Sequence, residues 1–146
     1  MHANFLLLAI FGIAMAHLEG VVVVYLRKAI GLIDSDPETG NKELLEQIPR
    51  RYIRIEMTRE AATIVMLVAL ALLVGQSIVE QIMVFLWTFA FWDLFYYVSL
   101  YLVIKWPPRL STTDVLFLIP VPWIAPVWFP VGVSTLTIIL IAVFYL

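Results

Sequence analysis

Four long apolar stretches, separated by more polar segments, set the pattern of this chain. They cover residues 3–26, 56–74, 79–104 and 126–146. Each is close to the roughly 20 apolar residues that a helix needs to cross the hydrocarbon core of a bilayer. The pattern predicts an all-α fold: an integral membrane four-helix bundle that forms a single transmembrane domain over residues 1–146.

The segments between these stretches differ in length and in chemistry. Residues 27–55 form a long charged loop, whereas Gly75-Gln76-Ser77 allows only a tight hairpin between two helices. Residues 115–125 belong to an apolar stretch with four prolines, which lack the N–H groups that a helix needs. We expect this Pro-rich segment to be broken before the last helix, either as a re-entrant loop or, as we favour, as an interfacial elbow.

Two smaller features lie within the 27–55 loop. The acidic residues 34–38 resemble the start of a calcium loop, but the later glycine and glutamate of an EF-hand are not at their required offsets. A solvated turn is therefore favoured there. Leu44, Leu45 and Ile48 have a spacing that favours a short interfacial helix over residues 41–48.

The distribution of basic residues predicts the orientation. All nine Lys and Arg residues lie in or beside the first and third loops, and both termini and the turn at 75–77 carry none. Basic residues of membrane proteins gather on the cytoplasmic side. We therefore expect an N-out/C-out topology with the 27–55 loop in the cytoplasm, and the cytoplasmic (inner) membrane of a prokaryote as the location.

The N-terminal apolar run has a rival interpretation as a cleaved signal peptide, because Ala14-Met15-Ala16 has the small-x-small form of a cleavage site. However, no Lys or Arg precedes the run, and the apolar sequence resumes at Val21–Leu26. A retained first span is therefore favoured.

Composition supports a membrane chain and excludes several classes of function. Hydrophobic residues make up 63% and charged residues 14% of the chain, far from the balance of a water-soluble domain. The net charge of −2 gives no basis for binding nucleic acid, so the expected partners are the lipid bilayer and either other membrane subunits or further copies of the chain. Cysteine is absent and His2 lies far along the helix from His17, so neither an iron–sulfur cluster nor a haem is expected; any other cofactor is left open.

Three acids lie inside the predicted spans by at least one helical turn from either end: Glu19, Glu60 and Asp93. By helix rise they lie roughly 10, 8 and 16 Å from the cytoplasmic ends of their spans. A charged side chain at the bilayer centre costs at least about 2.5–3.5 kcal/mol, so each acid needs a partner, a proton or a role. These acids are our candidates for binding protons or cations.

Asp93 is the deepest of the three acids and has aromatic neighbours at helical spacing. Tyr96 and Tyr97 lie one turn later, so their phenols either relay the proton of Asp93 or satisfy its carboxylate as hydrogen-bond donors in a packed interface. Both interpretations stay open. In the packed-interface interpretation, the residues expected to serve as interfacial anchors are Trp92, Trp106 and Tyr101.

Glu60 shares a helical stripe with Glu56, one turn before it. Two carboxylates at this spacing can share a proton or a cation. Arg59 lies alongside, and we expect Glu56 and Arg59 to form a supporting ion pair at the membrane edge.

Glu19 shares its stripe with two small residues, Gly12 and Ala16. Small residues at this spacing let another helix approach closely. Glu19 is therefore expected to face protein rather than lipid.

The residues around these acids are similar to a known sequence pattern. The pattern consists of Trp92-Asp93-x-Phe95-Tyr96-Tyr97, Trp106-Pro107 and Asp114-Val115-Leu116-Phe117-Leu118-Ile119-Pro120-Val121-Pro122-Trp123, together with Arg59-Glu60-x-Ala62-Thr63, Glu19 and Tyr25-Leu26-Arg27. It resembles a family of small, uncharacterised prokaryotic membrane proteins, and the likeness covers most of the chain. The resemblance implies a four-helix membrane fold and supplies no activity.

Enzyme signatures are missing, since the chain has no G-x-S-x-G, P-loop, H-E-x-x-H or dinucleotide fingerprint. We favour a small non-enzymatic membrane protein that acts as a complex subunit or an oligomer. Its intramembrane carboxylate and tyrosine cluster would serve proton or cation handling, including ion translocation, or assembly. The alternative is a membrane oxidoreductase component that binds a quinone or a carboxylate-ligated metal beside Asp93 and the tyrosines.

Overall fold

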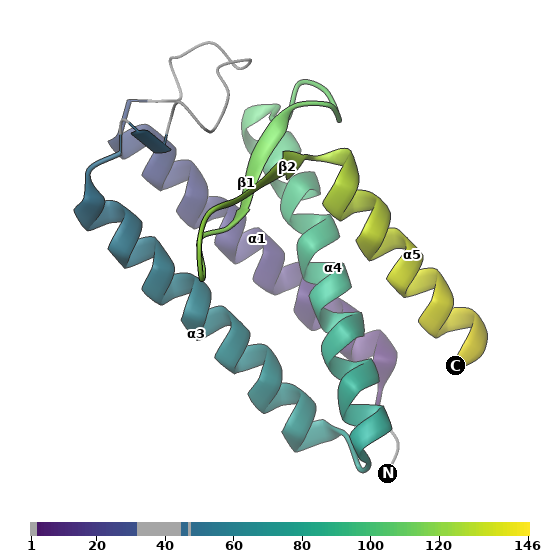
Figure 1. Cartoon of the computed structure of the whole chain (residues 1–146). Coiled ribbons are helices and arrows are strands. Elements are labelled where there is room, and N and C mark those ends of the chain that lie inside the picture. Colours follow the sequence, from purple (N-terminus) through teal and green to yellow (C-terminus); the bar gives the residue numbers. More distant parts are fainter. Residues whose placement is uncertain (1–2, 32–44, 47) are drawn as a thin grey trace.

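The computed structural model describes residues 3–31, 45–46 and 48–146, which form four helices and one β-hairpin (Figure 1). The elements follow in the order α1 (Phe5–Ala29), α3 (Arg50–Val74), α4 (Ile78–Ile104), β1 (Thr113–Phe117), β2 (Trp123–Pro126) and α5 (Trp128–Phe144). The acidic stretch at 34–38 and most of the expected interfacial helix at 41–48 lie outside the described residues.

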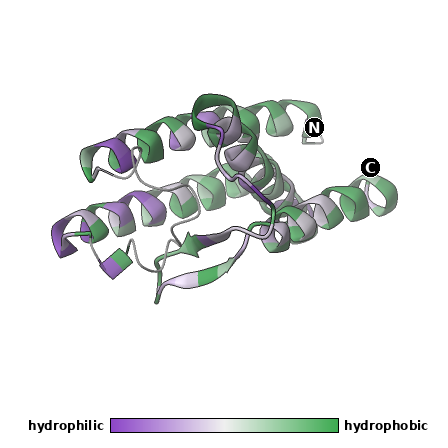
Figure 2. Ribbon diagram, turned by 90° about the horizontal axis from the view of Figure 1, so that it is seen from above, coloured by the Kyte–Doolittle hydropathy of each residue, from purple (hydrophilic) through white to green (hydrophobic). Residues whose placement is uncertain are grey.

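Three of the helices, α1, α3 and α4, are long and apolar enough to cross a membrane. The chain is thus an integral membrane protein, as its hydropathy predicts. The last helix, α5, has 17 residues and a length of roughly 26 Å, somewhat less than the hydrocarbon core of a typical bilayer. Hydrophilic residues gather at the end of α1 and α3 that lies away from the two termini (Figure 2).

Helix α4 is the centre of the bundle, because it packs against α1, α3 and α5. Small residues allow the close approach of α1. A Cβ atom added at Gly12 would lie 2.9 Å from the carbonyl oxygen of Thr88, and one at Gly20 would lie 2.8 Å from the Oγ atom of Ser99. Ala16, between the two glycines, is fully buried. The small-residue stripe of α1 therefore faces α4 of the same chain.

The end of the bundle near the two termini is closed by a buried acid that the sequence did not single out. Glu80, in the first turn of α4, accepts hydrogen bonds from the backbone N–H groups of Ala3 and Gln76, each at 2.8 Å. Nearby, the indole N–H of Trp87 donates to the carbonyl oxygen of Phe5 at 2.8 Å. These bonds fix the start of α1 against the start of α4.

The Pro-rich segment forms an antiparallel hairpin, so the expectation of an all-α chain is wrong here. Thr113 pairs with Pro126 and Val115 with Ile124, and the register shifts between Val115 and Phe117. Prolines fall in the turn and at the end of a strand, where a missing N–H costs no ladder hydrogen bond. Figure 1 shows the hairpin in front of α1, reaching from the start of α5 toward α3.

Helix α3 starts six residues before the apolar stretch that predicts it, at Arg50 rather than at residue 56. Hydropathy locates the part of a helix that lies in lipid, and a polar extension continues the same hydrogen-bonded helix into the headgroup region. The other long helices begin and end within about three residues of their predicted stretches.

Candidate functional site

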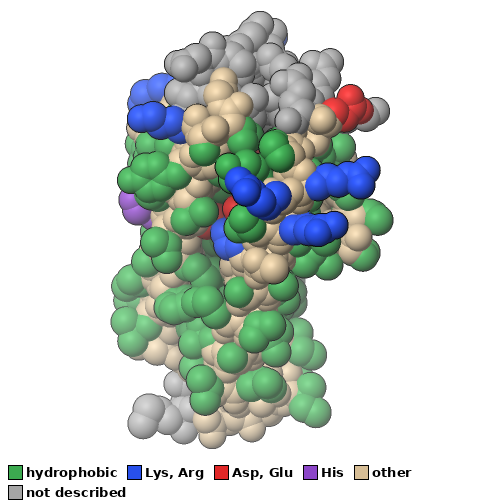
Figure 3. Space-filling model, turned by 90° about the vertical axis from the view of Figure 1, so that its left-hand side faces the viewer, with side chains coloured by type: hydrophobic (Ala, Val, Ile, Leu, Met, Phe, Trp, Pro, Cys, Tyr) green, Lys and Arg blue, Asp and Glu red, His purple; other side chains and the backbone are tan. Residues whose placement is uncertain are grey.

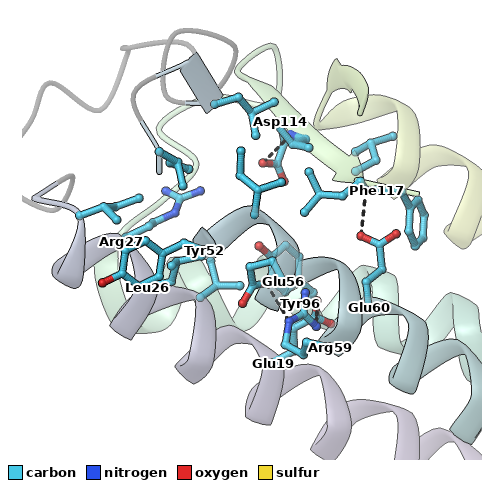
Figure 4. A pocket seen from close by; sticks show the side chains of 18 of the residues that line it. Glu19, Leu26, Arg27, Tyr52, Glu56, Arg59, Glu60, Tyr96, Asp114 and Phe117 are labelled. Atoms are coloured by element: carbon cyan, nitrogen blue, oxygen red, sulfur yellow. Dashed lines mark hydrogen bonds and ion pairs between the residues drawn. The ribbon is translucent and has the colours of Figure 1, made fainter. Parts of the chain in front are cut away.

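A cavity of about 150 Å³ lies between α1, α3, α4 and the hairpin, at the end of the bundle that carries the basic residues (Figure 4). This is the size of an engineered apolar cavity that binds benzene. The cavity brings together every residue that the sequence nominates for the site. These are Glu19 on α1, Glu56, Arg59 and Glu60 on α3, and Asp93, Tyr96 and Tyr97 on α4.

Arg59 links two carboxylates that come from different helices. Its Nη1 atom lies 2.7 Å from Oε1 of Glu19 on α1, and its Nε atom lies 2.8 Å from Oε2 of Glu56 on its own helix. The indole N–H of Trp92 donates to the second oxygen of Glu19. All three charged side chains are mostly buried, where ion pairs are less screened than at a protein surface. This network crosses the cavity between α1 and α3 and leaves one net negative charge.

Asp93 receives its hydrogen bond from α5. The hydroxyl group of Ser134 donates to Oδ2 of Asp93 at 2.6 Å. The expectation that Tyr96 or Tyr97 donates to Asp93 is wrong. A phenol hydroxyl lies at the far end of a long rigid side chain, so a tyrosine on the same stripe reaches past its helical neighbour to another element.

The hydroxyl group of Tyr97 instead donates to Oδ2 of Asp114 on β1, at 3.0 Å. Asp114 is 4% exposed, and its Oδ1 atom also accepts from the backbone N–H of Val115 at 2.8 Å. Burial raises the pKa of the Asp114 carboxyl to about 6, against the opposing effects of Arg27 and of the two hydrogen bonds. Asp114 belongs to the sequence pattern that resembles a known family but not to the predicted acid cluster; an acid that opens an apolar, Pro-rich stretch was the available signal.

Glu60 binds the hairpin rather than another charged side chain. It is 7% exposed, and its two oxygens accept hydrogen bonds from the backbone N–H groups of Leu118 at 2.8 Å and Ile119 at 3.1 Å. The prolines that follow break the strand ladder, so these two amides need an acceptor from elsewhere. Glu60 thus attaches the hairpin to α3 over the cavity.

Two tryptophans expected at the membrane interface are inside the protein. Trp92 is 5% exposed and bonded to Glu19, and Trp106 is 6% exposed with the guanidinium of Arg27 lying 4.1 Å from the centre of its ring. His17 lies outside the cavity lining, and its Nδ1 atom is 2.8 Å from the hydroxyl oxygen of Ser99 across the α1–α4 contact.

The cavity lining has more acids than bases. Among its described residues are five carboxylates and two guanidiniums: Glu19, Glu56, Glu60, Asp93 and Asp114 against Arg27 and Arg59. Within residues 3–31, 45–46 and 48–146, no three His, Cys, Asp or Glu side chains lie close enough together to hold a metal ion. The arrangement therefore gives no support to a carboxylate-ligated metal.

Comparison with known protein families, curated proteins and solved structures found no match to this chain. The geometry of the cavity and of its hydrogen bonds is accordingly the basis for assigning a function.

Proposed function

We propose that this protein is a small, non-enzymatic integral membrane subunit whose acid-rich cavity takes up and releases protons or a cation. The observation that carries this proposal is the excess of carboxylates over guanidiniums around a single cavity. An uncompensated charge in a low-dielectric site is costly, so the excess negative charge has to be balanced.

The two arginines do not balance it. Arg59 is already engaged by Glu19 and Glu56, and Arg27 lies over the ring of Trp106 and acts on Asp114, so two guanidiniums face five carboxylates. Asp93 has only the neutral hydroxyl of Ser134 as its donor among the described residues. Protons or an added cation supply the missing positive charge, and their uptake and release would be coupled to the packing of α4 against α5.

The orientation that we propose places this cavity on the cytoplasmic side, with both termini outside. The basic residues that predict this orientation lie around the cavity end of the molecule. In Figure 3, Lys and Arg side chains gather on the upper part of one face, and acidic side chains are visible in a hollow between them. Protons or cations would then enter from the cytoplasm.

We also propose that the chain works with other membrane subunits or with further copies of itself. Each of the three long helices keeps most of its apolar surface outside the fold, since only 17–33% of the residues in its most apolar window are buried. Lipid covers such a surface, and so do neighbouring helices. The mass of the native complex in a mild detergent distinguishes a monomer from an assembly.

The test follows protonation of the carboxyl groups by infrared spectroscopy of the purified protein in lipid nanodiscs. Stepwise changes of pH should produce a protonated-carboxyl band in the wild-type protein, and part of this band should be missing in Asp93→Asn. Identical difference spectra for the two proteins would overturn the assignment to Asp93. A spectrum without any titrating buried carboxyl, or a quinone in the organic extract of the sample, would favour the oxidoreductase alternative.

A further inference from the structure

We infer that the cavity binds an amphipathic organic cation: an ammonium group attached to a ring or to a short chain of similar size. This inference rests on the proposed function, because it names the class of cation that balances the excess carboxylates. Three observations support it: the volume of the cavity, the lining carboxylates that each have one oxygen without a hydrogen-bond donor among the described residues, and the aromatic lining.

Two carboxylate oxygens at the cavity wall meet no donor within the described part of the chain. Glu56 uses Oε2 for Arg59, and Asp93 uses Oδ2 for Ser134. Their other oxygens, Oε1 of Glu56 and Oδ1 of Asp93, have no hydrogen-bond or ion-pair partner among those residues. An ammonium group carries three N–H donors and one positive charge, so it can satisfy either of these acceptors.

The rest of the lining suits an organic group rather than a bare metal ion. Aromatic side chains from three elements, α3, α4 and β1, contribute to it: Tyr52, Trp92, Tyr96, Tyr97 and Phe117. Ring faces attract cations and also provide apolar contact for the carbon part of an amine. The cavity, at about 150 Å³, is about ten times larger than the space that a single water needs. A metal ion would require three converging ligand side chains, which the described residues do not provide.

An anionic ligand, such as a fatty acid or a lipid phosphate, fits this cavity less well. Both lining guanidiniums are engaged within the protein, Arg59 by two carboxylates and Arg27 by the ring of Trp106. An anion would also lie close to five carboxylates. Charge complementarity therefore selects a cation.

The experiment compares three small probes that share one phenylethyl skeleton and differ in charge. They are 2-phenylethylamine, 2-phenylethanol and phenylacetate, which at pH 7 are cationic, neutral and anionic. Binding to the full chain in nanodiscs is measured by isothermal titration calorimetry. We expect saturable binding of the amine at least tenfold tighter than that of the alcohol, and no binding of phenylacetate.

Two variants test where the amine binds. Asp93→Asn should weaken binding of the amine at least tenfold and should leave the affinity for the alcohol unchanged. Glu46→Gln is the matched control, because Glu46 is an exposed carboxylate that does not line the cavity. This variant should bind the amine with the same affinity as the wild-type protein. If Asp93→Asn does not fold, Tyr96→Leu takes its place. This variant removes an aromatic ring without changing the charge, and it should weaken binding of the amine at least threefold.

The outcomes separate this inference from the proposed function. Equal binding of the amine and the alcohol, tighter binding of phenylacetate, or unchanged amine affinity in the cavity variants would each overturn it. If no probe binds while the infrared titration of the carboxyl groups is present, the organic-cation inference fails and the proposed function stands. If neither the binding nor the titration is observed, both fail.

Discussion

The carboxylate of Glu60 on α3 accepts a hydrogen bond from the backbone N–H of Leu118 at 2.8 Å, although 58 residues separate the two along the chain. The same carboxylate accepts from the next amide, that of Ile119. Through these bonds, a membrane-embedded acid fixes the position of the hairpin that covers the cavity. An acid with two backbone donors differs from Asp93, which has one hydroxyl donor and an oxygen directed to no protein donor among the described residues.

Replacing Glu60 should release the hairpin. Glu60→Ala leaves two backbone N–H groups without their acceptor, and each such loss costs about 1–3 kcal/mol. We expect faster hydrogen exchange at the amides of Leu118 and Ile119 and a lower unfolding temperature. Glu60→Gln keeps one acceptor oxygen and should show a smaller effect. Exchange rates that match the wild type in the Ala variant would show that the hairpin is held by its packing alone.

Asp114 should make the protein less stable as the pH rises through about 6. Its pKa is raised from 3.8 to about 6 in the folded state, so the folded protein binds the proton more tightly than the unfolded chain does. The resulting stabilisation, about 3 kcal/mol, is complete below pH 3.8 and is lost as the pH rises through the folded-state value. The charged or titratable groups that act on it include Arg27, Tyr97 and Asp93.

Asp114→Asn should remove this part of the pH dependence. The difference in unfolding free energy between the variant and the wild type should grow in favour of the variant between pH 4 and pH 7. Unfolding in detergent at several pH values measures it, with the exposed Glu46→Gln as the control. A difference that stays constant with pH would contradict the raised pKa.

The contact between α1 and α4 should not tolerate a large residue at Gly12. A Cβ atom there would lie 2.9 Å from a backbone oxygen of α4, and backbone cannot rotate away as a side chain can. Gly12→Leu should lower the free energy of unfolding by about 1–3 kcal/mol, because the larger side chain overpacks the contact. Ala14→Leu, on the exposed side of the same helix, is the matched control and should be neutral. If Gly12→Leu unfolds like the wild type while the mass of its native complex changes, the stripe is a contact between subunits.

Cysteine labelling tests the proposed topology directly, because the chain contains no cysteine. Gln76 and Ser111 are exposed residues in the turn after α3 and in the segment after α4. Cysteines at these two positions should react with a membrane-impermeant reagent from opposite sides, Ser111→Cys from the cytoplasm. Ser35, in the 27–55 loop, should react from the same side as Ser111. Labelling of Gln76→Cys and Ser111→Cys from one side would exclude α4 as a complete span.

Local patterns identified much of the candidate site. Depth along a helix follows from residue count, so the sequence nominates Glu19, Glu60 and Asp93 as buried acids. The ion pair between Glu56 and Arg59 follows from their spacing of three residues on one helix. Both inferences use the geometry of one helix only.

The sequence by itself determined the membrane character, the approximate extent of the helices and the acids that they bury, because hydropathy and helical periodicity are local properties. The tertiary structure alone decided the partners of those acids: Ser134 for Asp93, the hairpin amides for Glu60, and Arg59 for Glu19. These pairings depend on how each helix is rotated and shifted against its neighbours, which packing across the whole bundle sets. The hairpin was missed for a related reason. Prolines show where a helix cannot form, but which strand pairs with which, and which distant carboxylate receives the remaining amides, is a long-range outcome.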